Sequence, residues 1–203
     1  GRSMLTEPEA KSVLAAYAIP VVETRVASNA ANAVQAAIDL GFPVALKILS
    51  PDISHKSDVG GVMLNLQSAD EVRSAAEAIQ WRCAKLRPDA RLTGFTVQQM
   101  IMRGGAHELI VGCTTDAIFG PVILFGQGGT AVEAVADKAV ALPPLNVPLA
   151  RDLVAQTRIA KLLAGYRDCP PADVDAIHLT LIKISQLIAD MPEIVELDIN
   201  PLL

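Results

Sequence analysis

The segment VALKILSPDISHKSDVGGV, residues 44–62, combines residue types that could bind and transfer a phosphoryl group. Lys47 interrupts an apolar strand pattern, and strand alternation places it on one face with Ala45 and Leu49. A buried ammonium is costly without a partner. Lys47 could therefore reach into a cleft and hold a phosphate, or it could protect the edge of a sheet. The strand alone leaves both interpretations open.

The loop after this strand adds a nucleophile, a cation and two glycines. His55 and Lys56 could place an imidazole and an ammonium beside an anion. Gly60 and Gly61 would let backbone N–H groups approach that anion closely. A lone loop histidine can also be simply solvated. The loop is thus a candidate phosphate site with His55 as its candidate nucleophile.

Two further patterns lie towards the end of the chain. FGQGGTAVE, with Gly126, Gly128 and Gly129, could cradle a phosphate or form an ordinary hairpin turn. In ELDINP, strand alternation places Glu196, Asp198 and Asn200 on one face. Carboxylate and amide oxygens suit magnesium, which also keeps water and substrate phosphate as ligands. The alternative for this strand is a solvated polar face.

The elements predicted to position these residues alternate between strands and helices in the first part of the chain. They are a helix after the Thr6–Glu9 capping box, a strand at 21–26, a helix at 28–41 capped by Ser28, strands at 43–48 and 61–66, and a helix at 68–86 after the Ser68–Glu71 capping box.

From Leu92 the pattern changes to short strands with glycine turns, which indicates an antiparallel sheet and the start of a second lobe. The predicted elements are strands at 93–101, 107–115, 120–126 and 130–135, helices at 148–164 and 171–190, and a last strand at 193–201. We therefore expect a mixed α/β (α+β) protein of two lobes that share one cleft.

Composition excludes several classes of protein. A net charge of -5 and aromatic content of 3% argue against a nucleic-acid surface. Apolar runs fall short of the ~20 residues that a membrane span needs. Three widely spaced cysteines predict neither a disulfide framework nor a zinc site, which favours the cytoplasm. Residues 1–4 are expected to be an expression remnant.

Taken in order, the lysine strand, SPDISHKSDVGGV, HELIVGCTTDAIFGPVILFGQGG and ELDINPLL resemble the ATP-grasp domain of nucleoside-diphosphate-forming acyl-CoA synthetases. The resemblance covers residues 5–203. That family is similar to the beta chain of succinyl-CoA synthetase. The stretch GQGGTAVEAVADKAVALPPLN looks most like the branch fused to a GNAT-type lysine acetyltransferase.

The resemblance implies an ATP-grasp fold that holds the nucleotide between two lobes. The small lobe would span about 21–95, and the larger lobe about 96–203 plus the N-terminal helix at 5–20. It also implies that the chain is truncated at its C-terminus, before a further strand whose aspartate helps to hold magnesium.

The resemblance also implies site residues. Lys47 matches the lysine that binds nucleotide phosphates, and His55 matches the histidine that accepts a phosphoryl group and relays it to a partner domain. The implied nucleotide contacts are Gln98, Gln99, Met100, Ile101, Glu108, Gly126, Gly128 and Gly129. The implied magnesium ligands are Asp198 and Asn200.

The implied activity is that of an acid–CoA ligase (ADP-forming), with ATP/ADP and Mg²⁺ as cofactors and acetyl-CoA or a similar acyl-CoA as a reactant. The implied partners are CoA-binding and ligase domains of the same protein and a GNAT acetyltransferase domain. The alternative is a regulatory ATP-grasp domain that senses nucleotide or acyl-CoA without turnover. Only the ligase requires phosphate on His55.

Overall fold

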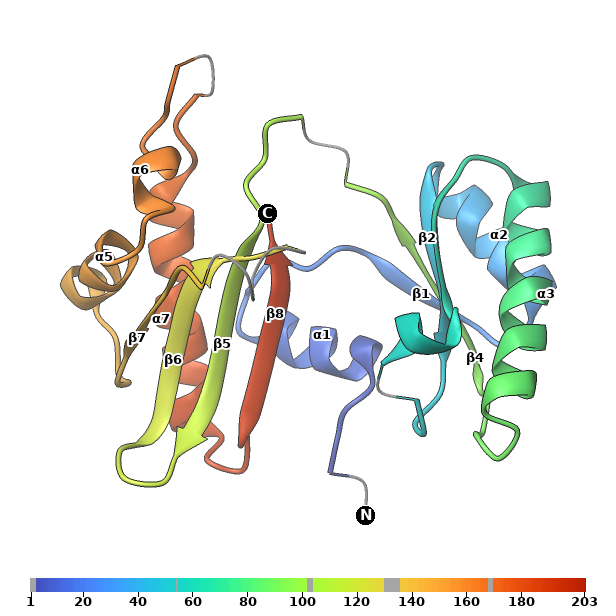
Figure 1. The fold of residues 1–203 in the computed structure, drawn as a ribbon, viewed down its shortest axis with the longest axis horizontal. Helices are drawn as coiled ribbons and strands as arrows, with labels where there is room; N and C mark the ends of the chain where they lie inside the picture. Colours follow the sequence, from blue (N-terminus) through green and yellow to red (C-terminus); the bar gives the residue numbers. More distant parts are fainter. Residues whose placement is uncertain (1–2, 54, 102–103, 130–135, 168–169) are drawn as a thin grey trace. The chain divides into compact units, whose positions relative to one another are not determined.

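The structure is a computed structural model that describes residues 3–53, 55–101, 104–129, 136–167 and 170–203. The chain divides into two compact units, Gly1–Met102 and Arg103–Leu203 (Figure 1), and each is described by itself. The N-terminal helix belongs to the first unit. The expected assignment of residues 5–20 to a larger lobe, and the lobe boundary near residue 95, stay predictions. The predicted strand at 130–135 lies outside the described residues.

The first unit contains a four-stranded antiparallel sheet in the order β1-β4-β2-β3. Its strands are β1 (Thr24–Ala27), β2 (Val44–Leu49), β3 (Val62–Leu66) and β4 (Gly94–Gln99). The predicted grouping of the segment at 93–101 with the strands that follow it was wrong. β4 instead pairs with β1 on one side and β2 on the other, because strand pairing is not encoded locally.

Helices α2 (Ala30–Leu40) and α3 (Ala69–Leu86) cover one face of this sheet (Figure 1). The helix α3 begins as predicted, since the Ser68 hydroxyl accepts a hydrogen bond of 3.2 Å from the Glu71 N–H. The predicted cap of α2 was one residue early. The Asn29 side chain, not Ser28, accepts from the Asn32 N–H at 2.9 Å.

The same face holds the core of the unit. Its large, fully buried side chains include Val44, Leu46, Ile48, Ile79 and Phe95. Alternation along β2 therefore leaves Lys47 on the other face, away from α2 and α3.

Helix α1 (Glu7–Ala16) lies on that other face of the sheet (Figure 1). It begins at the predicted capping box, where the Glu9 carboxylate accepts from the Thr6 N–H at 2.7 Å. A short 3-10 helix, η1 (Lys56–Val59), follows His55 in the loop between β2 and β3. Both elements bring charged side chains towards Lys47.

The second unit has a four-stranded antiparallel sheet in the order β7-β6-β5-β8. The helices lie on one side of it (Figure 1). Its elements are β5 (Leu109–Asp116), β6 (Gly120–Gln127), β7 (Lys138–Ala141), α5 (Val147–Ala155), α6 (Ala160–Leu163), α7 (Val174–Asp190) and β8 (Glu196–Leu202).

The predicted continuous helix at 148–164 is interrupted between α5 and α6. The buried Asp137 carboxylate accepts hydrogen bonds of 2.7 Å from the N–H groups of Arg158 and Ile159. These N–H groups cannot also bond within a helix that continues from α5. A side chain 21 residues away in the sequence thus starts a new helix.

Candidate functional site

Lys47 lies on an interior strand and forms an ion pair, so the edge-protection interpretation does not hold. Its Nζ is 3.0 Å from Glu7 Oε1, and Lys11 Nζ is 3.1 Å from the same oxygen. Lys56 Nζ lies 3.8 Å from Glu7 Oε2. We call these four residues the lysine cluster. Its three ammonium groups face one carboxylate, so positive charge is in excess.

Lys11 also contacts polar side chains on the face of the first sheet that carries α1. Its ammonium donates to Thr24 Oγ1 at 2.7 Å and to the Gln98 side-chain oxygen at 2.8 Å. Thr96, which faces Lys47 across the β2–β4 ladder, is fully buried. Its hydroxyl has no hydrogen-bond partner within the described part of the chain. The predicted residues Lys47 and Gln98 therefore belong to one polar surface.

Burial and pairing act in opposite directions on the charged groups here. Burial alone would raise the pKa of Glu7, but the Lys47 and Lys11 ammonium groups hold that pKa below its usual value. Burial lowers the pKa of Lys11, although the Glu7 carboxylate opposes the shift. Glu7 is therefore a carboxylate at neutral pH.

His55 is exposed and immediately precedes η1. The loop around it is fastened at both ends. The Ile48 N–H donates to the Gly61 carbonyl at 2.7 Å, and Arg87 donates to the Asp52 carbonyl at 3.2 Å. Gly60 adopts a left-handed conformation with φ of 62°, which a side chain would strain. The loop thus holds His55 next in sequence to a member of the lysine cluster.

The end of β4 carries the other predicted residues of the first unit. Gln99 is the last residue of the strand, and the Met100 N–H donates to the Pro43 carbonyl at 3.0 Å. Ile101 is exposed. The adenine-binding role expected for residues 98–101 stays a prediction.

Residues of three segments meet at the glycine turn of the second unit. The Gly128 N–H donates to the Glu108 carbonyl at 2.7 Å, and the Gly129 N–H donates to Asn200 Oδ1 at 3.1 Å. Gly129 has φ of 81°, and a Cβ there would collide with the Glu108 carboxylate. A Cβ on Gly126 would collide with the Asp137 carbonyl. Backbone conformation at Gly129 and the close approach of neighbouring backbone at Gly126 and Gly128 therefore favour glycine independently of any ligand.

The polar face of β8 is exposed at Glu196, Asp198 and Asn200, as alternation predicted. Partial desolvation, followed by the negative charge of Glu196, raises the pKa of Asp198. No group of three or more His, Cys, Asp or Glu that could hold a metal ion occurs among the residues with described positions. Asp198 and Asn200 nevertheless fit magnesium, which needs only one or two protein ligands when phosphate and water complete its shell.

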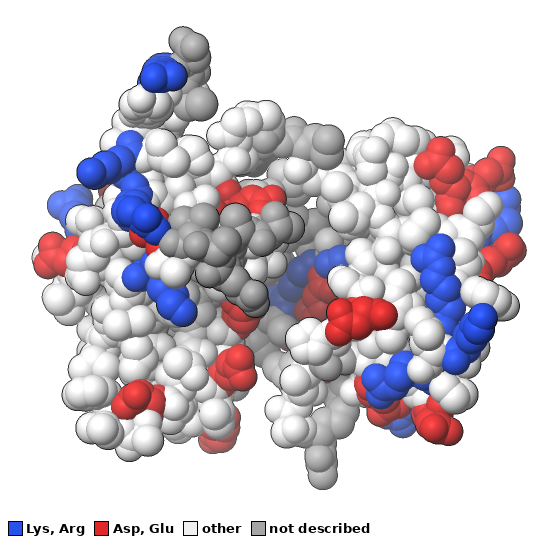
Figure 2. Space-filling model, in the orientation of Figure 1, with Lys and Arg blue, Asp and Glu red and all other residues white. Residues whose placement is uncertain are grey.

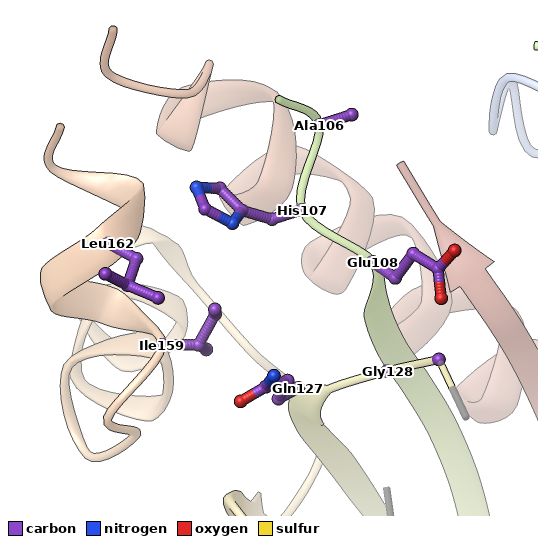
Figure 3. A pocket seen from close by; sticks show the side chains of 8 residues that line it. Ala106, His107, Glu108, Gln127, Gly128, Ile159 and Leu162 are labelled. Carbon is purple, nitrogen blue, oxygen red and sulfur yellow. The ribbon is translucent and has the colours of Figure 1, made fainter. Parts of the chain in front are cut away.

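A pocket of about 300 Å³ lies beside the glycine turn. Figure 3 shows the His107 ring pointing into it towards Ile159 and Leu162, whereas Glu108 points away from that wall. His107 is not among the site residues predicted from the sequence. The signal that could have found it is its position directly before Glu108 at the start of β5.

The face of the first unit that Figure 2 shows is mixed in charge. On the face shown in Figure 2, Lys and Arg side chains are interspersed with Asp and Glu. Within the part of the chain that the structure describes, no helix has the length and apolar character needed to span a bilayer.

Comparison with known proteins shows the family of the chain. A family model described as an ATP-grasp domain matches residues 1–203. The chain belongs to the ATP-grasp domain family. Its mixed α+β architecture, with two antiparallel sheets, is that of its structural neighbours and confirms the predicted fold class.

Two relatives of this ATP-grasp domain, each about 40% identical to it, are named as ADP-forming ligases. The beta subunit of acetate–CoA ligase [ADP-forming] I from Pyrococcus furiosus is 39% identical over 198 residues, which are 98% of this chain and 84% of that protein. The 4-hydroxybutyrate–CoA ligase [ADP-forming] of Nitrosopumilus maritimus is 40% identical over 202 residues, which are 100% of this chain and 29% of that protein. The same domain thus occurs as a subunit and as part of longer chains.

A solved relative has the same fold as this ATP-grasp domain. It is the dinucleotide-forming acetyl-coenzyme A synthetase 1 of Ca. Korarchaeum cryptofilum. In complex with coenzyme A, Ca-AMPCP and HgCl⁺ it aligns with a TM-score of 0.91 and 40% identity, over 97% of this chain and 85% of that chain. Its complex with coenzyme A and Mg-AMPPCP has the phosphohistidine segment pointing towards the nucleotide binding site. This complex aligns with a TM-score of 0.84 and 38% identity, over 99% of this chain and 86% of that chain.

Proposed function

We propose that the chain is the nucleotide-binding module of an acid–CoA ligase (ADP-forming), and that His55 carries the phosphoryl group between nucleotide and partner domain. The lysine cluster beside the His55 loop is the observation that carries this proposal. It gathers three cations on the sheet face that carries α1, where they could hold a polyphosphate. The ligase names of the relatives support turnover over a purely sensing role.

The proposed step is an in-line phosphoryl transfer. The unprotonated ring nitrogen of His55 donates its lone pair to the terminal phosphorus of ATP. A nitrogen–phosphorus bond forms while the bond from that phosphorus to the ADP oxygen breaks, and ADP leaves with the electron pair. Lys47 neutralises the phosphoryl oxygens, so catalysis rests on position and charge.

Magnesium would supply further charge neutralisation at the phosphates. We propose Asp198 and Asn200 as its protein ligands, with Glu108 and the Gly126–Gly129 turn as nucleotide contacts in the second unit. The archaeal synthetase binds Mg-AMPPCP, and this supports the proposal that the chain binds a nucleotide together with magnesium.

The whole protein would join a small carboxylic acid to coenzyme A through further CoA-binding and ligase domains or subunits. Relatives named for acetate and 4-hydroxybutyrate support this substrate class. A fused GNAT acetyltransferase domain stays a prediction, which the length of the natural protein would test. A cytoplasmic location is also proposed, because Cys83 and Cys113 are buried free thiols suited to a reducing compartment.

Calorimetric titration with ATP and ADP in the presence of Mg²⁺ tests the binding. We expect Lys47→Ala to weaken binding by at least about tenfold, the effect of losing one charged hydrogen bond. The exposed Lys85→Ala serves as the matched control. Wild-type affinity in the Lys47 variant would refute the phosphate role of this lysine.

Radiolabelled ATP tests the transfer. We expect acid-labile, alkali-stable label on the wild-type chain and none on His55→Asn. Equal labelling of both proteins would exclude His55 as the acceptor. Nucleotide binding without any label, in the chain supplied with its partner domains, would favour the sensing alternative.

A further inference from the structure

Glu7 occupies the position in the lysine cluster that an anion would take. One oxygen, Oε1, lies 3.0 Å from Lys47 Nζ and 3.1 Å from Lys11 Nζ, while Oε2 faces Lys56 at 3.8 Å. The two carboxylate oxygens thus satisfy ammonium groups from α1, β2 and η1. A phosphate group has the same kind of oxygen atoms and could replace them one for one.

The cluster needs such a partner whenever no ligand is bound. The side chains of Glu7, Lys11, Lys47 and Lys56 are 20–22% exposed, so water screens their charges only in part. Three ammonium groups gathered around one carboxylate would repel one another without an anion among them. A carboxylate from the same chain offsets part of this repulsion and holds the three side chains in place.

The surroundings give the carboxylate room to move. A pocket of about 100 Å³ adjoins Glu7 and Lys56 and is lined by residues 4–7, 49–51 and 53. Glu7 stands in the first turn of α1, where only its side chain needs to rotate for an anion to reach Lys47 and Lys11. Lys11 remains fixed meanwhile, because Thr24 and Gln98 accept hydrogen bonds from its ammonium.

We propose that Glu7 is the resident counter-ion of the phosphate site, that nucleotide phosphate displaces its carboxylate from Lys47, and that Lys11 is a second phosphate ligand. This inference rests on the proposed function, because it takes the phosphate to be that of ATP or ADP. Glu7 therefore competes with the ligand, and Lys11 cooperates with Lys47.

Two substitutions with opposite expected signs test this inference. Glu7→Gln keeps the size of the side chain but removes the competing charge, so we expect Mg-ADP to bind about three- to tenfold more tightly. Lys11→Gln removes a ligand, so we expect binding to weaken by about tenfold. Glu77→Gln and Lys85→Gln, both exposed on α3, are the matched controls and should leave affinity unchanged.

A merely structural role gives a different pattern. If Glu7 only positions the lysines, Glu7→Gln weakens binding as Lys11→Gln does, and the proposal is overturned. Circular dichroism and the melting temperature without ligand show whether each variant is folded. If Glu7→Gln does not fold, Lys11→Gln decides alone, and unchanged affinity in that variant overturns the proposal.

Inorganic tripolyphosphate separates this inference from the proposed function. It presents the same phosphate oxygens without a base or ribose. If the wild type binds tripolyphosphate but no nucleotide, and Glu7→Gln binds it more tightly, the counter-ion stands while the nucleotide assignment fails. If the wild type binds neither probe, or Glu7→Gln changes the affinity for neither, the counter-ion is rejected.

Discussion

The Gly129 N–H donates a hydrogen bond of 3.1 Å to the side-chain oxygen of Asn200. This bond joins the turn after β6 to β8, although the two residues are 71 positions apart in the chain. The same turn is held from its other side, where Gly128 donates to the Glu108 carbonyl at 2.7 Å. The proposed metal-binding strand and the proposed phosphate-binding turn are therefore one connected structure.

Two substitutions of Asn200 should distinguish the role of its side-chain oxygen from the role of its side-chain size. Asn200→Ala removes the acceptor for Gly129 and a proposed magnesium ligand, so we expect Mg-ADP to bind about tenfold more weakly. Asn200→Asp keeps an oxygen at the same place and should retain most of the affinity. Titration calorimetry of both variants measures this difference. An alanine variant that binds like the wild type would show that neither contact matters for the ligand.

The ionised Asp198 carboxylate should lower the stability of the folded chain and should be needed for magnesium binding. Its pKa is raised, so the folded state disfavours its ionised form, and that cost is present above the ordinary aspartate pKa of about 3.9. We expect Asp198→Asn to raise the melting temperature at neutral pH and to lose the magnesium dependence of nucleotide binding. The difference in melting temperature should shrink as the pH falls towards about 4. If Asp198→Asn is less stable than the wild type at neutral pH, the predicted sign of the stability change is wrong.

Glu7 should give the opposite pH dependence. Its pKa is lowered in the folded state, so its stabilising effect is fully present above the ordinary glutamate pKa of about 4.3 and is lost as the pH falls through the folded value. At neutral pH, and without ligand, Glu7→Gln should cost about 1–3 kcal/mol of unfolding free energy. Denaturant unfolding across this pH range should show the two proteins converging in acid. If the difference in unfolding free energy between the two proteins stays constant in acid, the ion pairs of Glu7 are not its cause.

Asp137 should contribute more to the free energy of unfolding than the exposed Asp152 does. Asp137→Ala would leave the N–H groups of Arg158 and Ile159 without the carboxylate that they share, at a cost of about 2–3 kcal/mol. Asp152→Ala, on the exposed side of α5, is the control and should change stability by less than about 0.5 kcal/mol. Denaturant unfolding of both variants compares them. Equal effects would mean that the break between α5 and α6 does not depend on Asp137.

Local patterns in the sequence predicted the local structure well. The Ser68 cap and the Thr6–Glu9 capping box are correct because a cap is made by residues within one turn of each other. Alternation along β8 correctly placed Asp198 and Asn200 on one exposed face. These signals need no knowledge of the rest of the chain.

Contacts between distant segments could not be predicted in this way. Glu7 and Lys47 are 40 residues apart, and nothing near Lys47 indicates that its partner is the first residue of α1. The central position of β4 could not be predicted for the same reason, nor could the break between α5 and α6 that Asp137 causes. Each depends on which elements pack together, which the propensities of single segments do not determine.

The interior position of Lys47 also bears on how the chain finds its fold. A slip of β2 by one residue against β4 would turn Lys47 towards α2 and α3 and would move Leu46 and Ile48 to the polar face that carries α1. An ammonium in that apolar layer would have no partner, so the mispaired sheet would be far less stable than the native one. The lysine that we assign to phosphate binding therefore also selects the correct strand register during folding.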